Sequence, residues 1–242
     1  MVENNLPTLV FIHHFGGNSG SWNWINKRFL KKYTCIFLNL PGFGKSKALD
    51  EISIRSMSEW IANEIRNLGN DNYILIGHAM GGKLALFTAF ILHDLLPKKL
   101  ILIAPSPLTK IDISDADKQR ISHHLDKVEA EENVRSLINK EIKKSKFDYV
   151  VESQLEVDKK AWKWWLSKGK INDITWAIRN LEVPMYVITS NNDPVVTKET
   201  LQKEVFPYLN RARFISFGKS GHLIPIESSR KLVRVLKRII SE

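Results

Sequence analysis

Short apolar runs alternate along the chain with longer stretches of helical spacing. The runs cover residues 9–13, 35–40, 73–76, 100–104, 185–189 and 213–217, and turn residues bound them. Most runs lack a polar residue at every second position, which is typical of strands buried on both faces of a sheet. Helical spacing is found over residues 22–31, 54–68, 82–92, 198–206 and 228–240. This alternation predicts β–α–β units around a mainly parallel sheet.

The alternation stops between residues 105 and 181. This stretch shows no convincing strand pattern, is rich in charge, and contains Trp162, Trp164, Trp165 and Trp176 at helical spacing. We therefore expect a helical insertion over residues 106–180 and a core formed by residues 1–105 and 181–242.

The composition narrows the class of protein. A chain of 242 residues with 43% hydrophobic residues can bury a sizeable core, which excludes a disordered chain. The single cysteine, Cys35, allows no disulfide within the chain and suits a reducing compartment. The sequence shows no signal-peptide pattern and no apolar run long enough for a membrane span. We expect a cytoplasmic protein without a membrane partner.

A sharp turn is predicted between the third apolar run and the helix that follows it. The turn reads Gly77-His78-Ala79-Met80-Gly81. Small residues two positions before and two after Ala79 allow a strand to enter a helix abruptly. Such a turn exposes its central side chain at the carboxyl end of the sheet, beside a helix N-terminus that stabilises negative charge. Serine at the centre would be a nucleophile, but an alanine methyl group cannot attack a carbonyl carbon.

Four features together resemble the α/β-hydrolase fold superfamily over nearly the whole chain. They are the turn at Ala79, the loop His13-His14-Phe15-Gly16-Gly17, the loop Pro41-Gly42-Phe43-Gly44-Lys45-Ser46, and the pair Asn192-Asp193-Pro194 and Gly221-His222-Leu223. The resemblance implies an α/β-hydrolase fold with a helical cap inserted after the sixth strand of the family. Within the superfamily the chain is similar to pimeloyl-carrier-protein methyl ester esterases of biotin synthesis. Thioesterases and lyases of the same fold remain alternatives.

The resemblance also implies a role for each motif. Position 79 corresponds to the nucleophile, Asp193 to the acid and His222 to the base of a serine-esterase triad. The backbone N–H groups of Phe15 and Met80 correspond to the oxyanion hole. Because the family usually has serine where this chain has Ala79, the chain is interpreted as an inactivated serine-to-alanine form. The alternative is a natural, non-catalytic protein that binds a ligand in an inherited pocket.

Other polar residues near the motifs are interpreted as structural. Asp193 can also form a turn with its own backbone before Pro194. His13 and His78 are expected to support their loops. Glu227 is expected to cap the last helix or to place charge at its start.

The expected substrate-binding residues are His14, Trp22, Trp162 and Trp165. His14 replaces a glycine that is usual in the first loop of the family, and the tryptophans either line an apolar acyl pocket or pack the cap against the core. A metal site is not expected, because His123 and His124 lack spaced carboxylate or cysteine partners. No cofactor is implied.

The net charge of +10 raises the question of an acidic partner. The positive excess is spread along the chain, and no motif or basic stripe with interleaved aromatic residues indicates nucleic acid. The resemblance implies hydrolysis of a carboxylic ester, either a small molecule or an acyl methyl ester on an acidic acyl carrier protein. The charge is compatible with such a carrier, because opposite charge accelerates and orients protein encounters.

Overall fold

A computed structural model describes residues 6–25, 27–122 and 124–242. Within these residues, the strands form one parallel sheet in the order β2-β1-β3-β4-β5-β6. The strands are β1 (Thr8–Ile12), β2 (Cys35–Leu38), β3 (Tyr73–His78), β4 (Lys99–Ile103), β5 (Met185–Ser190) and β6 (Arg213–Phe217). The predicted strand over residues 213–217 is confirmed residue for residue, and the other predicted runs agree to within two residues at either end.

Helices flank the sheet and form the insertion after β4. The helices outside the insertion are α1 (Lys27–Lys32), α2 (Ile54–Arg66), α3 (Met80–Ile91), α9 (Lys198–Glu204), α10 (Ile224–Glu227) and α11 (Ser229–Ser241), with short turns η1 (Ser19–Trp22) and η3 (Phe206–Tyr208). Those between β4 and β5 are α4 (Asp115–Ser122), α5 (Lys127–Leu137), α6 (Lys144–Leu155), α7 (Lys159–Trp164), η2 (Trp165–Gly169) and α8 (Thr175–Ile178). The predicted helix over residues 22–31 instead contains the end of η1 and most of α1.

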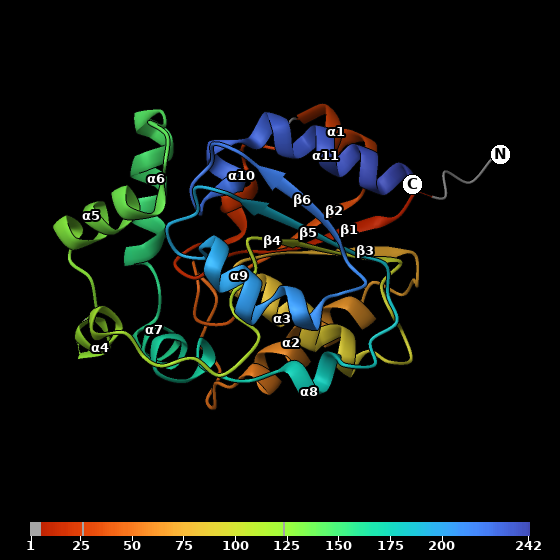
Figure 1. Cartoon of the computed structure of the whole chain (residues 1–242), viewed down its shortest axis with the longest axis horizontal. Helices are drawn as coiled ribbons and strands as arrows, with labels where there is room; N and C mark the ends of the chain where they lie inside the picture. The colour runs from red at the N-terminus through yellow and green to blue at the C-terminus, as the bar shows by residue number, and fades with distance from the viewer. Residues whose placement is uncertain (1–5, 26, 123) are drawn as a thin grey trace.

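The sheet separates two layers of buried side chains. Along β1, Val10 and Ile12 belong to one cluster, whereas Leu9 and Phe11 belong to the other, because neighbouring residues of a strand point to opposite faces. Helices α2, α3 and α9 cover the first face, and α1 and α11 cover the second (Figure 1). This arrangement confirms the predicted α/β fold with a parallel sheet between helices.

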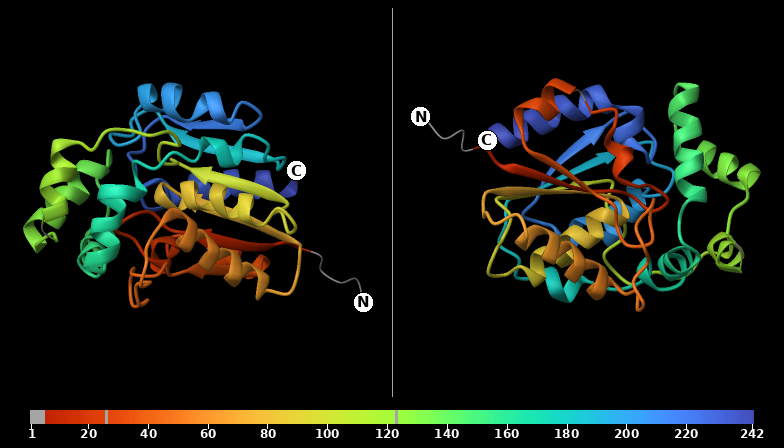
Figure 2. Two further views of the ribbon diagram at one scale, coloured as in Figure 1. Left: turned by 90° about the horizontal axis from the view of Figure 1, so that it is seen from below. Right: turned by 180° about the vertical axis from the view of Figure 1, so that it is seen from behind.

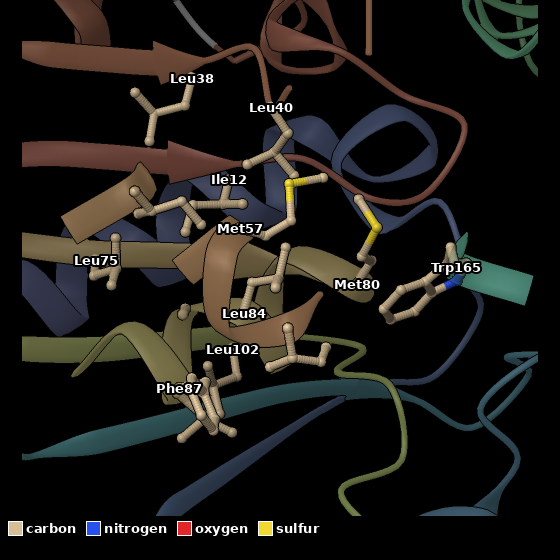
Figure 3. Close-up of a cluster of buried hydrophobic side chains, with 14 of the residues drawn as sticks. Ile12, Leu38, Leu40, Met57, Leu75, Met80, Leu84, Phe87, Leu102 and Trp165 are labelled. Atoms are coloured by element: carbon tan, nitrogen blue, oxygen red, sulfur yellow. The ribbon is translucent and has the colours of Figure 1, made fainter. Parts of the chain in front are cut away.

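The insertion lies at the end of the sheet where the strands finish. Helices α4 to α7 lie beyond the carboxyl ends of the strands, whereas α8 packs against α3 at the side of the core (Figure 2). Figure 3 shows the side chain of Met80 between the buried cluster and Trp165 of the insertion. The carboxyl ends of parallel strands are where ligands bind in open α/β sheets. In the described residues, no helix has the length and apolar character that crossing a membrane requires.

Candidate active site

The turn around Ala79 has strained backbone geometry. Ala79 lies between β3 and α3 with a φ of 49° and a ψ of −112°, which residues other than glycine rarely adopt. A Cβ atom on Gly77 would lie 2.3 Å from the main-chain oxygen of Gly81, and one on Gly81 would lie 2.4 Å from that of Ile12. The strand and the helix therefore pack this closely only with glycine at both positions.

Main-chain hydrogen bonds hold the turn on both sides. The N–H of Ala79 donates to the oxygen of Ile103 at 2.9 Å, and the oxygen of Ala79 accepts the N–H of Gly82 at 2.9 Å. Met80 is the first residue of α3, so its N–H has no acceptor within the helix. That N–H is therefore available to a ligand and carries part of the positive charge of the helix N-terminus.

Asp193 and His222 form a buried pair after β5 and β6. Nδ1 of His222 lies 2.9 Å from Oδ2 and 3.1 Å from Oδ1 of Asp193. Oδ1 also accepts the N–H groups of Val195 and Val196 at 2.8 Å and 2.9 Å, so Asp193 forms its expected turn while it holds the imidazole. With Nδ1–H donated to Asp193, Nε2 of His222 is the nitrogen left to accept a proton.

The surroundings of Asp193 favour its ionised form. Burial raises the pKa of the carboxyl group, but the charge and the hydrogen bond of His222 and the N–H groups of Val196 and Val195 outweigh burial. The pKa of Asp193 is therefore lowered from its usual value. A carboxylate at this position stabilises the imidazolium that forms when His222 takes up a proton.

Hydrogen bonds from two directions hold the main chain of His222. Nε2–H of His78 donates to the oxygen of His222 at 2.9 Å, and the N–H of His222 donates to the oxygen of Leu137, the last residue of α5, at 2.8 Å. Burial, reinforced by the charge of His222, lowers the pKa of His78 to about 3, so this imidazole is neutral at pH 7. His78 thus supports the histidine loop, as expected.

Glu227 does not form the predicted cap of the last helix, although it lies just before the start of that helix. Its Oε2 accepts the N–H groups of Gly221 and Asn139, each at 3.0 Å, and that of Lys140 at 3.2 Å. The last helix, α11, begins later, at Ser229. The carboxylate therefore joins the loop that contains His222 to the segment after α5 and does not cap a helix.

The first glycine-rich loop is fixed by His13. Its Nδ1–H donates to the oxygen of His14 at 2.8 Å, and its Nε2 accepts the N–H of Leu40 at 3.2 Å. Burial lowers the pKa of His13 to about 4, which leaves the ring neutral and able to bond in both directions. In the same loop, the oxygen of Gly16 accepts the hydroxyl of Ser153 from α6 at 2.8 Å. The loop is thereby joined to the core and to the insertion.

A cavity of about 430 Å³ brings the predicted site residues together. Ala79, His222, Phe15 and Met80 all line it, so the turn, the expected base and both expected oxyanion residues border the same space. Cavities of this size hold small-molecule ligands. A ligand bound there would lie beside His222 and the first turn of α3.

Two tryptophans of the insertion form part of the cavity wall. Trp162 and Trp165 both line the cavity, and the ring centroid of Phe15 lies 4.8 Å from that of Trp162 and 6.2 Å from that of Trp165. Nε1–H of Trp162 donates to the main-chain oxygen of Arg120 at 2.8 Å, which satisfies its polar group. The aromatic rings are therefore available as an apolar surface.

His14 and Trp22 differ from each other in their relation to the cavity. His14 lines it, yet both ring nitrogens are buried without a hydrogen-bond partner among the described residues. Burial, with the charges of neighbouring histidines, lowers the pKa of His14 well below 6.5. Trp22 is 1% exposed, and its ring lies 5.0 Å from that of Phe11 and 6.4 Å from that of His78. The structure thus places Trp22 in the core and not in the cavity wall.

Sequence motifs did not identify the charged residues of the cavity. These are Asp112, Asp117, Arg120, Lys170, Glu199, Lys203 and Glu204. Nζ of Lys170 lies 2.5 Å from Oδ2 of Asp117, and the Asp117 side chain is 7% exposed. The high charge of residues 106–180 was the available signal for the four of them in the insertion, but it did not show which charges face inward, and no signal marked the three on α9.

Of the two histidines of the insertion, only His124 falls within the described residues. The ring of His124 packs 4.9 Å from that of Trp162, and His123 lies outside the described residues. Among the residues that the structure describes, no group of three or more histidine, cysteine, aspartate or glutamate side chains is arranged to hold a metal ion.

Known proteins resemble this chain in sequence. A Haemophilus influenzae protein that carries an esterase/lipase name is 23% identical over 98% of this chain and 84% of its own length. The pimeloyl-acyl-carrier-protein methyl ester esterase of Pseudoalteromonas atlantica is 33% identical over 103 residues, which are 42% of this chain and 38% of that protein. The second match therefore spans less than half of either protein.

Solved structures show the same fold. An esterase from Exiguobacterium antarcticum superposes with a TM-score of 0.88 over 98% of this chain and 92% of that one, at 18% identity. A thermophilic esterase from Thermogutta terrifontis superposes with a TM-score of 0.78 over 98% and 89%, at 20% identity. The sequence profile of the alpha/beta hydrolase fold matches residues 7–130, which is more than half of the chain. The chain therefore belongs to the α/β-hydrolase fold family.

Proposed function

We propose that the chain carries an ester site of the serine-esterase type in which Ala79 stands in place of the nucleophile. The observation that carries this proposal is the pairing of His222 with Asp193 beside a cavity that Ala79 also lines. An acid–base pair of this geometry moves a proton to and from a nucleophile at the turn. The esterase names of the sequence relatives support the reaction class.

With serine at position 79, the proposed reaction passes through an acyl-enzyme. Nε2 of His222 takes the hydroxyl proton as the serine oxygen attacks the ester carbonyl carbon, and it returns the proton to the leaving alcohol. The N–H groups of Phe15 and Met80 stabilise the oxyanion, and one such donor contributes about 3 kcal/mol. Water then attacks the acyl-enzyme with His222 again as the base.

The cavity wall favours an acyl group with an apolar part. Trp162, Trp165 and Leu166 line it from the insertion, and Val195 and Val196 line it from the loop after β5. Burial of apolar surface against these side chains stabilises a complex by roughly 25 cal/mol per Å². The proposed substrate is therefore a carboxylic ester whose acyl chain lies against the cap.

We propose further that the ester is an acyl methyl ester on an acidic acyl carrier protein. Support comes from the partial match to the pimeloyl-acyl-carrier-protein methyl ester esterase and from the net charge of +10. A positive protein attracts an acidic partner and increases the rate of encounter.

The intact acid–base pair favours the interpretation that this chain derives from an active serine enzyme in which alanine has replaced the serine. A protein that only binds a ligand has no chemical need for a buried Asp193–His222 pair or for an alanine with a φ of 49°. The alanine closes the acyl-enzyme route but leaves the cavity wall in place. The proposed outcome is a chain that binds its ester and retains it far longer than a serine enzyme would.

The variant Ala79→Ser tests the reaction class with a short p-nitrophenyl ester. We expect a burst of p-nitrophenol equal to the enzyme concentration, followed by turnover, and loss of both in the double variant A79S/H222Q. Ala104→Ser is the matched control, because Ala104 is also a buried alanine with a positive φ, of 42°. Absence of a burst in A79S, together with no gain in rate over the Ala79 chain, would overturn the proposal.

Native mass spectrometry of the Ala79 chain tests the proposal that the ester is borne by an acyl carrier protein. We expect retention of an acyl-methyl-ester carrier protein with its ester intact, and weaker retention as the salt concentration rises. The carrier protein without an acyl group is the control. Retention of a free methyl ester without any retention of the loaded carrier would contradict the proposed carrier protein. The proposed ester hydrolysis would be unaffected.

A further inference from the structure

The acid–base pair and the oxyanion groups are independent of the side chain at position 79. Asp193 holds Nδ1 of His222 at 2.9 Å, and this contact involves no atom of Ala79. The N–H groups of Phe15 and Met80 belong to the main chain. The alanine therefore removes the covalent nucleophile, while the base and the oxyanion groups remain.

The backbone of Ala79 keeps the shape that a nucleophile needs. A φ of 49° is a strained conformation for a residue other than glycine. Hydrogen bonds to Ile103 and Gly82 hold the turn in this shape. As a result, the first N–H of α3 and the Ala79 methyl group stay at the cavity that His222 lines.

Water is the nucleophile that the chemistry of this cavity allows. Ala79 and His222 line the same cavity, so water that enters the cavity reaches both side chains. The alanine side chain ends at Cβ and places no oxygen of its own in this space. An ester whose carbonyl oxygen meets the N–H groups of Phe15 and Met80 presents its carbon to this water.

We propose that the chain as it stands hydrolyses activated carboxylic esters slowly, with water as the nucleophile and His222 as the general base, and without an acyl-enzyme. This inference rests on the proposed ester site. The water oxygen forms a bond to the carbonyl carbon while one water proton passes to Nε2 of His222. The carbonyl electron pair moves to the oxygen, and the resulting intermediate expels the alcohol oxygen, which takes the proton from Nε2. One ester and one water give one acid and one alcohol.

The size of the effect follows from general-base catalysis. A positioned base accelerates such a step by about 10²–10⁴-fold. We therefore expect the Ala79 chain to hydrolyse a p-nitrophenyl ester at least about 100-fold faster than the variant His222→Gln. We also expect the Ala79 chain to be far slower than Ala79→Ser, because serine held in place attacks without the ordering of a free water.

The experiment compares multiple turnovers by the full Ala79 chain, His222→Gln, Asp193→Asn and the control His93→Gln. His93 is an exposed histidine outside the cavity lining, so its variant should keep the parent rate. We expect Asp193→Asn to lose most of the rate, because the imidazole loses its orientation. Turnover well beyond one equivalent separates catalysis from acylation of surface lysines. Intact mass spectrometry during turnover should show no acyl adduct.

Two results would overturn the inference. The first is a hydrolysis rate in His222→Gln equal to that of the parent, with the folding of the variant checked by circular dichroism. Asp193→Asn serves as a second variant in case His222→Gln does not fold. The second is an acyl adduct on the parent chain, for example on Ser106, which also lines the cavity. The burst of Ala79→Ser, measured in parallel, shows whether the water route alone or the ester site as a whole is refuted. A burst without His222-dependent turnover of the parent refutes only the water route, whereas absence of both refutes the ester site as well.

Discussion

Glu227 accepts the N–H of Gly221, the residue before His222, and with the same oxygen accepts the N–H of Asn139 beyond α5, each at 3.0 Å. The same two segments meet again where His222 donates its N–H to Leu137 at 2.8 Å. A Cβ atom on Gly221 would lie 2.5 Å from the oxygen of Leu137, so the segments are in direct contact. The position of His222 therefore depends on the end of α5 and on the segment that follows it.

The variant Glu227→Ala should reduce catalysis through this contact. Measured in the Ala79→Ser background, we expect kcat to fall about tenfold or more, because hydrogen bonds to a charged acceptor contribute about 1.5–3 kcal/mol. KM should change less, since Glu227 is not part of the cavity wall. Glu227→Gln keeps an acceptor oxygen and should recover most of kcat.

The matched control for Glu227 is Glu59→Gln, which affects only a surface ion pair with Arg55 at 3.3 Å. Steady-state kinetics and the thermal midpoint of each variant are the measurements. A kcat of Glu227→Ala within twofold of its parent would show that the loop holds the base without this carboxylate.

Replacement of Ala79 by glycine should stabilise the fold. Relief of the strain at a φ of 49° raises the free energy of unfolding by about 1–3 kcal/mol. The extra freedom of glycine in the unfolded chain lowers it by about 0.5–1 kcal/mol. The expected net gain of about 1 kcal/mol raises Tm by roughly 2–4 °C for a chain of this size. Ala104→Gly, at a φ of 42°, should behave alike, whereas Ala85→Gly within α3 should lower Tm. A lower Tm for A79G would mean that the turn stores no strain.

Much of the fold could be predicted because its signals are local. Each strand is a short apolar run, and burial on both faces makes such runs continuous in a parallel sheet. Asp193 and His222 are 29 residues apart, yet each lies in the loop after a strand, and the carboxyl ends of parallel strands share one edge. A site assembled at strand ends can therefore be predicted from its parts.

The remaining contacts had no signal in the sequence. Glu227 binds main-chain N–H groups that are 87 and 88 residues away, and no side-chain pattern marks a main-chain partner. Trp22 follows the first loop closely, but spacing does not give the direction of its ring, which packs on Phe11 in the core. Long-range packing, and not local propensity, decides both positions.

Asp193→Asn should destabilise the protein at neutral pH. The folded pKa of Asp193 is lowered, so its carboxylate contributes stability above the ordinary pKa of about 3.9 and loses it as the pH falls through the folded value. We expect a loss of about 1–3 kcal/mol at pH 7, because Asp193 is 5% exposed and bonds four ways. The difference in free energy of unfolding between the variant and the parent should shrink below about pH 4. Urea unfolding at both pH values measures it, and Asp94→Asn, an exposed partner of Arg66, should change little.

Buried neutral histidines should make the fold sensitive to mild acid. Burial lowers the pKa of His13 to about 4 and that of His78 to about 3, from 6.5 in an unfolded chain. Below pH 6.5 the unfolded chain takes up protons that the native chain does not, so the free energy of unfolding falls by up to about 1.4 kcal/mol per pH unit for each histidine. His78→Gln can still donate to His222 but does not titrate, so urea unfolding between pH 7 and pH 4 should show a shallower decline. Equal slopes for the variant and the parent would show that His78 titrates alike in the native and unfolded states, so that burial does not lower its pKa.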